Sequence, residues 1–149
     1  ICEYINERYL DGRGWPVDVA ARAQARSAAA GMHSGFGALR AQMPMNMRRT
    51  PDKYRWDDAA TRDAARIQAM WRELREAHGQ GGPFLCGAFS IVDAMYAPVV
   101  SRFLSYGVPM DDNARAFADA IQSLPAWNRW RDAAFAEVEY LVDTEHFRA

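Results

Sequence analysis

Apolar residues recur every three or four positions along most of the chain, which is the spacing of one face of an α-helix. The pattern is clearest between about residues 56 and 78, where the apolar stripe consists of Ile67, Met70, Trp71, Leu74 and Ala77. Further helices are expected over residues 1–10, 18–43, 90–106 and 112–124, and from residue 125 onward. No segment alternates between apolar and polar residues. The sequence therefore predicts an all-α fold, an orthogonal or up-down bundle of about five to six helices.

The last of these helices is expected to be long. Pro125 suits a first helical turn, because proline lacks the N–H that would be unpaired there. The apolar stripe that follows consists of Trp127, Trp130, Ala134, Val138 and Leu141. This stripe predicts that the helix continues beyond residue 138.

The helix expected over residues 90–106 begins with a strong N-terminal signal. Ser90 and Asp93 stand three residues apart, so that each side chain can bond the backbone N–H of the other in a capping box. The residues that follow are apolar on nearly all sides, which is typical of a helix in the middle of a core. Pro98 removes one backbone donor and is expected to bend this helix, although tertiary packing can offset the cost. We expect Ser90 and Asp93 to be structural, in preference to a catalytic role for the Asp93 carboxylate.

Three glycines, Gly31, Gly35 and Gly37, fall inside the second expected helix. Each costs about 1 kcal/mol relative to alanine in a helix interior. Close approach of another helix, within the domain or across a dimer, is the explanation that we favour over a bound ligand. His33 is expected to be exposed or interfacial, with a structural role.

Charge and composition exclude several classes of function. The 149 residues carry 18 basic and 19 acidic side chains, which gives a net charge of −1 and no general electrostatic reason to bind nucleic acid. No apolar run approaches the roughly 20 residues of a membrane span, and the three histidines lack the spacing of a metal site. One local basic cluster, which we interpret as a solvated loop, consists of Arg48, Arg49, Lys53 and Arg55.

The two cysteines, Cys2 and Cys86, are far apart and have no C-x-x-C partner. A core of this size does not need a disulfide. We interpret both as free thiols, buried or partly buried, in a reducing compartment.

Three segments resemble cytosolic glutathione transferases of a bacterial type. Residues 83–94, P-F-L-C-G-A-F-S-I-V-D-A, are similar to the F-L-x-G and F-S/T-x-x-D elements that open the buried core helix of the family's C-terminal domain. Residues 1–9, I-C-E-Y-I-N-E-R-Y, resemble the last helix of its thioredoxin-like first domain. Residues 31–46 resemble the first long helix of a bacterial branch, in which glutamate is common where Gly31 stands. The resemblance covers essentially the whole chain.

The resemblance implies a division of the chain. Residues 1–14 are expected to be the last helix of a preceding domain with its linker, and residues 15–149 a helical C-terminal domain. It further implies a cytoplasmic homodimer whose parent conjugates glutathione to an electrophile in detoxification, with glutathione as co-substrate and no cofactor. In the family the thiol-activating residue and most of the glutathione site belong to the first domain. No catalytic residue is therefore expected in this chain, which alone should be inactive.

In the family the second domain lines the pocket for the electrophile and contributes to the dimer interface. The candidate contacts here are Met32, Phe36, Leu39, Met43 and Tyr96. The first four share one stripe, and methionine and aromatic side chains adapt to varied apolar ligands. Core packing is the alternative for each of them. A non-enzymatic interaction protein of the same fold is the second hypothesis for the function, and an unrelated ligand-sensing bundle is the third.

Overall fold

The all-α prediction is confirmed. The computed structural model describes residues 1–49 and 54–139, and within these ranges it contains seven helices and no strand. The helices are α1 (Cys2–Tyr9), α2 (Val19–Ser34), α3 (Gly37–Gln42), α4 (Asp58–His78), α5 (Ile91–Tyr106), α6 (Asp112–Gln122) and α7 (Pro125–Ala136). One isolated antiparallel bridge joins Phe84 to Gly87 in the connection before α5.

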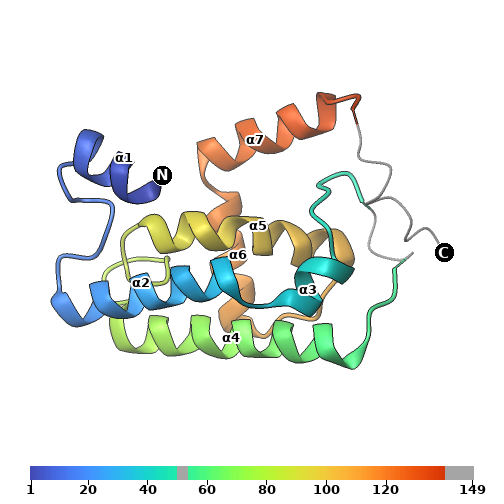
Figure 1. Cartoon of the computed structure of the whole chain (residues 1–149), viewed down its shortest axis with the longest axis horizontal. Helices are drawn as coiled ribbons and strands as arrows, with labels where there is room; N and C mark the ends of the chain where they lie inside the picture. Colours follow the sequence, from blue (N-terminus) through green and yellow to red (C-terminus); the bar gives the residue numbers. More distant parts are fainter. Residues whose placement is uncertain (50–53, 140–149) are drawn as a thin grey trace.

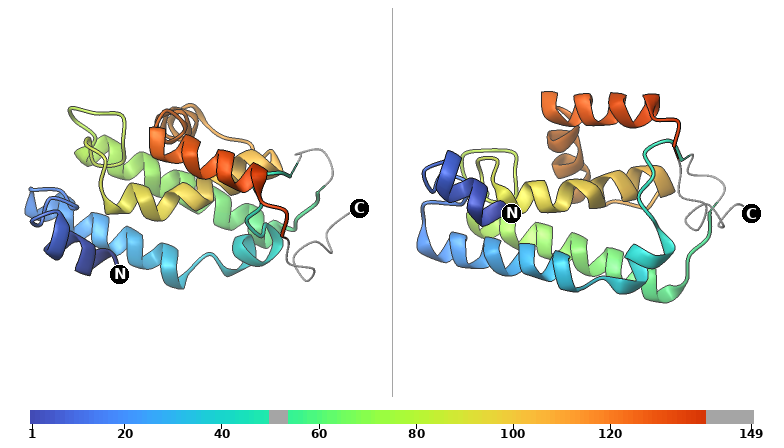
Figure 2. Two further views of the ribbon diagram at one scale, coloured as in Figure 1. Left: turned by 90° about the horizontal axis from the view of Figure 1, so that it is seen from above. Right: turned by 45° about the horizontal axis from the view of Figure 1, so that its top comes forward.

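Three long helices run side by side. α2 and α5 point in the same direction, and α4 runs in the opposite direction (Figure 1). α3 follows the end of α2 and packs against α4, while α6 lies behind α5 and α7 extends along one edge of the molecule. The two further views in Figure 2 show the same arrangement. The bundle therefore has α5 between α2 on one side and α6 on the other.

Trp71 of α4 holds the centre of the core. Its ring centroid lies 5.7 Å from that of Tyr96, 5.5 Å from that of Phe103 and 4.8 Å from that of Phe117. Edge-on and tilted aromatic pairs of this kind contribute about 0.5–1.5 kcal/mol beyond the area that they bury. One side chain thus connects α4 to both α5 and α6.

The stripe predicted for α4 agrees with the structure over most of its length. Ile67, Trp71 and Leu74 are buried, and Met70 is partly buried against the core. Ala77 is exposed, so the buried stripe ends about one turn before the helix does.

The continuous helix predicted over residues 18–43 is wrong. α2 ends at Ser34, Gly35 is extended at φ −106° and ψ −168°, and Phe36 adopts the left-handed region at φ +56°. α3 then begins in a new direction. The side chain of its N-cap residue, Phe36, makes no capping hydrogen bond. Instead, a carboxylate oxygen of Asp63 on α4 accepts the N–H of Leu39 at 3.0 Å. A contact made across the bundle, rather than local sequence, stabilises this second helix start.

Close packing within the chain does not explain Gly31 and Gly37. A Cβ added at Gly31 or Gly37 would meet nothing within 4 Å, so the expectation of a helix packed against them inside the domain is wrong. A Cβ at Gly35 would lie 2.7 Å from the carbonyl oxygen of Gly31, because Gly35 caps the last turn of α2 and its N–H donates to that oxygen at 2.8 Å. Packing of Gly31 and Gly37 across a dimer stays a prediction. His33, which was expected to be exposed or interfacial, is exposed.

The C-terminal helix is shorter than its stripe predicted. α7 ends at Ala136, and Val138 is 87% exposed beyond it, while Leu141 lies outside the described residues. Trp127 is buried and its ring packs edge-on against that of Trp130 at 5.6 Å. Only the first turns of α7 therefore contribute to the core.

The start of α5 is fixed by the expected capping box of Ser90 and Asp93. Asp93 is fully buried, and its carboxylate accepts the N–H and the hydroxyl of Ser90 at 2.7 and 3.1 Å and the N–H of Leu85 at 2.9 Å. The N–H of Ile91 donates to the carbonyl oxygen of Gly14 at 2.8 Å. Hydrogen bonds thus join the beginning of α5 to the connection between α1 and α2, at Gly14, and to the connection between α4 and α5, at Leu85. Assignment of residues 1–14 to a separate domain stays a prediction.

Candidate functional site

All five residues predicted to contact an electrophile lie in the buried core of this chain: Met32, Phe36, Leu39, Met43 and Tyr96. Met32 and Phe36 retain 7% and 8% of their surface, whereas the other three have none exposed. Core packing thus describes what these side chains do in the structure. Ligand contact by any of them stays a prediction.

The Tyr96 hydroxyl is engaged inside the core. It donates to the carbonyl oxygen of Ala28 at 2.9 Å, across the contact between α5 and α2. Burial raises the pKa of Tyr96 well above its usual value, and the positive charge of Arg66 opposes this only in part. The hydroxyl therefore stays protonated at neutral pH and serves to join two helices.

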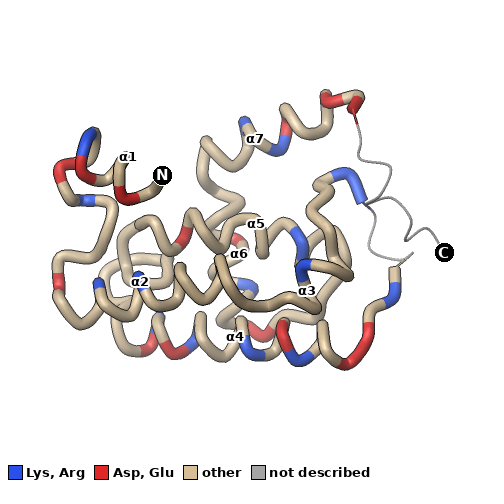
Figure 3. Tube along the Cα trace, in the orientation of Figure 1, with Lys and Arg blue, Asp and Glu red and all other residues tan. Residues whose placement is uncertain are grey.

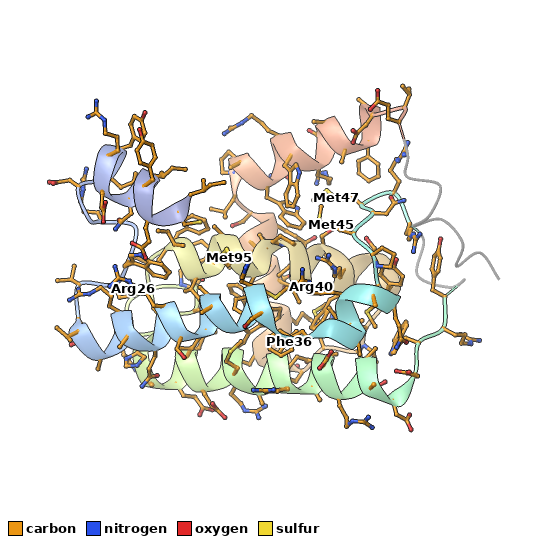
Figure 4. All side chains as sticks on the ribbon, in the orientation of Figure 1. Arg26, Phe36, Arg40, Met45, Met47 and Met95 are labelled. Carbon is orange, nitrogen blue, oxygen red and sulfur yellow. The ribbon has the colours of Figure 1, made fainter. Side chains whose placement is uncertain are left out.

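More accessible apolar side chains lie next to these core residues. Met47 and Met95 are partly buried against the core, and Met45 is 37% exposed. Figure 4 shows Met45 and Met47 between α5 and α7, and Met95 on α5. We call the surface formed by α2, α3, the connection of residues 43–49 and α5 the α2–α5 face. It carries the flexible apolar side chains of Met45, Met47 and Met95.

Two arginines from distant parts of the sequence belong to this face, and the second, Arg102, donates to the residue that ends α3, the helix of the first. The Arg102 Nε donates to the carbonyl oxygen of Met43 at 2.9 Å, and its Nη1 donates to that of Pro98 at 3.1 Å. An Nη1 of Arg40 donates to the carbonyl oxygen of His33 at 2.8 Å, and Figure 4 shows Arg40 between α3 and α5. Burial lowers the pKa of the Arg102 guanidinium, and the positive charge of Arg40 lowers it further. Sequence reasoning missed this pair because 62 positions along the chain separate its members.

The expectation that the basic cluster is a solvated loop is wrong for one of its members, Arg49. Arg49 is buried, and its guanidinium lies 4.6 Å from the ring centroid of Tyr54 and 5.3 Å from that of Tyr106. It also donates to the Tyr106 hydroxyl, which donates in turn to the carbonyl oxygen of Pro44 at 2.8 Å. Lys53 lies outside the described residues, and the other two arginines of the cluster are exposed. Arg49 therefore anchors the connection after α3 to the end of α5.

Both thiols are free and partly buried, as the cysteine spacing predicted. Burial, together with the nearby Asp93 carboxylate, raises the pKa of the Cys86 thiol to about 11. Since the thiolate is the nucleophilic form, Cys86 is a poor nucleophile at neutral pH.

No group of three or more His, Cys, Asp or Glu side chains in residues 1–49 and 54–139 is arranged to hold a metal ion. In the same ranges, every helix is too short or too polar to cross a lipid bilayer.

Comparison with known proteins agrees with this architecture. A family model described as the C-terminal domain of glutathione S-transferase matches residues 57–133, which include α4, α5 and α6 and most of α7. The search of curated proteins found no match. The matched segment covers more than half of the chain and contains the capping box and the buried helix that it starts. The chain therefore belongs to the glutathione S-transferase C-terminal domain family.

Proposed function

We propose that the protein carrying this chain is a glutathione transferase, in which a thioredoxin-like domain binds glutathione and this helical domain binds the electrophile. In the reaction the glutathione thiolate attacks an electrophilic carbon, and a carbon–sulfur bond forms. The bond from that carbon to its leaving group breaks, the leaving group departs with the electron pair, and the thiol proton passes to solvent. The homodimer implied by the family resemblance is part of the proposal.

The observation that carries the proposal is the family match over residues 57–133. The groups on this chain are consistent with a binding role. The Cys86 thiol has a pKa of about 11, and the Tyr96 hydroxyl already donates inside the core. Because a free thiol has a pKa of about 8.5, activation of glutathione needs a donor or a helix N-terminus beside the sulfur. In the family that group belongs to the first domain.

The contribution proposed for this domain is to hold the electrophile. Met45, Met47 and Met95 offer flexible thioether side chains that adapt to apolar rings. Holding the electrophile beside a bound thiolate converts a bimolecular step into an effectively unimolecular one, which by itself supplies a large part of the rate acceleration. Under this proposal the helical domain contributes to catalysis by positioning the electrophile.

The test is a kinetic assay of the full-length protein with glutathione and chlorodinitrobenzene, in which formation of the thioether is followed by absorbance. Met95→Ser is expected to raise the KM for chlorodinitrobenzene several-fold more than the KM for glutathione. Met110→Ser is the matched control, because Met110 is also partly buried but follows α5 and lies outside the α2–α5 face.

The outcomes separate the two functional hypotheses. Glutathione binding without turnover of any of a panel of electrophiles would favour the non-enzymatic binding protein. The absence of both glutathione binding and turnover would contradict the transferase, whereas the interaction protein does not require glutathione. Equal effects of Met95→Ser and Met110→Ser on the electrophile KM would remove the α2–α5 face from the proposed pocket.

A further inference from the structure

Charge is distributed unevenly between the helices. The elements of the α2–α5 face contain six arginines and a single carboxylate, that of Asp93, which is buried at the start of α5. α4 contains four arginines and four carboxylates. Figure 3 shows basic and acidic positions mixed along α4, whereas α3 and the nearby half of α5 have basic positions only. The protein's net charge of −1 therefore conceals a positive region.

Four of the six arginines have other structural partners: Arg22, Arg26, Arg48 and Arg49. Arg26 forms an ion pair with Glu3 at 3.3 Å, and Arg49 is enclosed by two tyrosine rings. The remaining two, Arg40 and Arg102, lie at the same end of α3, because Arg102 donates to the carbonyl oxygen of Met43, the residue that ends α3, three positions after Arg40. The positive charge of Arg40 accordingly lowers the pKa of Arg102.

Arg40 and Arg102 retain hydrogen-bonding capacity. A guanidinium has five N–H donors. In the described part of the chain, Arg102 uses two of them on carbonyl oxygens and Arg40 uses one. No carboxylate among residues 1–49 and 54–139 forms an ion pair with either group. Two neighbouring positive charges without a counter-charge repel each other, and an anion shared between them would offset this repulsion and form charge-assisted hydrogen bonds.

The surface around the two arginines is apolar. Arg102 donates to the carbonyl oxygen of Met43, and Met45 lies two residues further along the chain. Met95 lies about two turns before Arg102 on α5. A ligand that fits this surface is amphiphilic, with an apolar body against the methionines and a negative group at the arginines.

We infer that the electrophile taken by this protein carries an anionic group, such as a carboxylate, which is held by Arg40 and Arg102 while the apolar part lies against Met95, Met45 and Met47. The inference rests on the proposed function and narrows its substrate class. The carbon that reacts with the thiolate is then fixed at a set distance from the anionic group, so the two arginines act as positioning residues for the conjugation.

The experiment compares two electrophiles that differ in one group. Chlorodinitrobenzoate and chlorodinitrobenzamide, with the nitro groups beside the chlorine in both, react with thiolates by the same loss of chloride and differ in charge. The ratio of their kcat/KM values is measured on the full-length protein and on Arg40→Gln, Arg102→Gln and Arg102→Lys. Each ratio is corrected for the uncatalysed rates. Arg62→Gln is the control, because Arg62 is an exposed arginine of α4.

The wild-type protein is expected to prefer the benzoate, and Arg40→Gln and Arg102→Gln are each expected to reduce that preference about tenfold, the size of one charge-assisted hydrogen bond. Arg102→Lys should retain part of it, and Arg62→Gln all of it. A general loss of stability would lower both kcat/KM values together and leave their ratio unchanged. Equal turnover of the two compounds by the wild type would overturn the inference and leave the proposed function standing, as would an effect confined to the KM for glutathione.

A binding measurement tests the anion site if the protein does not turn over either electrophile. Calorimetric titration of chlorodinitrobenzoate and its amide into the full-length protein, without glutathione, is made at low and high salt. Binding that favours the benzoate, weakens with salt and is lost in Arg40→Gln would support the anion site even if no turnover occurs, in which case the proposed function fails alone. Equal binding of both compounds contradicts the inference directly.

Discussion

The chain breaks a helix where it has no proline and continues a helix through a proline. Between α2 and α3 the helix stops at Ser34 and restarts at Gly37 in a new direction. α5 runs from Ile91 to Tyr106 as one helix although Pro98 lies near its middle. Residue by residue, the proline is the stronger local signal for a break, since proline costs about 3 kcal/mol in a helix interior and glycine about 1.

The break after α2 is stabilised from outside the segment. Phe36 adopts a left-handed conformation, which costs on the order of 1 kcal/mol for a residue with a side chain. Burial of its ring offsets this cost, as only 8% of Phe36 remains exposed. The bond from the Leu39 N–H to Asp63 then supplies a cap that the local sequence lacks.

The continuity of α5 depends on its ends and on its packing. Pro98 has no N–H, so the carbonyl group of Ala94 loses its helical partner, but Ala94 is exposed to solvent. The start is held by Asp93, and Gly107 ends the helix in a left-handed conformation with its N–H on the carbonyl oxygen of Leu104. Local caps thus set both ends of α5, whereas a contact from α4 stabilises the start of α3, and four experiments test this difference.

The largest effect is expected at Asp93. Asp93→Ala would leave the N–H groups of Ser90 and Leu85 without their acceptor in a buried site, which costs about 1–3 kcal/mol for each group. We expect a loss of about 4 kcal/mol in the free energy of unfolding and a fall of about 10 °C in Tm. Asp93→Asn, which keeps one acceptor oxygen, should lose about half as much. Thermal unfolding measures both, and equal losses would contradict the account of the cap.

The second prediction concerns pH. Burial raises the pKa of Asp93 to about 6, against the hydrogen bonds from Leu85 and Ser90 that lower it. Because an unfolded aspartate has a pKa of about 3.9, the folded protein binds more protons between about pH 4 and 6. The contribution of this group to stability is therefore full below pH 4 and is lost as the pH rises through 6, by up to about 3 kcal/mol.

Urea unfolding of the wild type and of Asp93→Asn, at pH values from about 4 to 7, isolates this contribution, because the other carboxylates are common to both proteins. The stability advantage of the wild type should shrink as the pH rises. An advantage that grows with pH would mean that the hydrogen bonds outweigh burial at Asp93.

The third prediction uses two glycines four residues apart. Gly35→Ala would bring a Cβ within 2.7 Å of the carbonyl oxygen of Gly31, so we expect a loss of about 2 kcal/mol. Gly31→Ala places its Cβ in open space within α2 and should raise stability by up to about 1 kcal/mol. Chemical denaturation of both variants measures the difference. A loss of stability in Gly31→Ala in the assembled protein would instead support packing across a dimer.

The smallest effect is expected at Pro98. Pro98→Ala restores a helical N–H, while it also increases the freedom of the unfolded chain and removes a half-buried ring. The net result should be a gain of about 1 kcal/mol in the free energy of unfolding. Pro98→Gly, which restores the same N–H with a lower helix propensity, should be close to neutral. A clear destabilisation by both substitutions would show that the proline ring itself supports the packing of α5.

Sequence reasoning found what depends on local pattern. Ser90 and Asp93 are close in sequence and form a recognisable cap, and the stripe through Trp71 identifies the core face of α4. It failed where the deciding contact comes from elsewhere. Nothing in residues 18–43 indicates that Asp63 will cap α3, although three glycines in seven residues were a signal for a break.

The candidate site was less predictable than the fold. The apolar residues from Met32 to Met43 are buried in the core. Core packing and contact with an apolar ligand both require such side chains, so the sequence pattern cannot distinguish these two roles. The accessible Met95, the Arg40–Arg102 pair and the enclosed Arg49 all depend on which helices become neighbours. Only three-dimensional packing determines that.

The bond between Gly14 and the first N–H of α5 has a practical consequence for protein engineering. A Cβ at Gly14 would lie 2.7 Å from the side-chain oxygen of Asn6 and 2.9 Å from the side chain of Ile91, so there is no room for a side chain at this position. Chimeras that exchange the region upstream should therefore join the two parents before Asn6. Composition alone would suggest residues 10–16 as a tolerant linker. A junction placed there would disturb the hydrogen bond from Gly14 to Ile91 and so destabilise the start of α5.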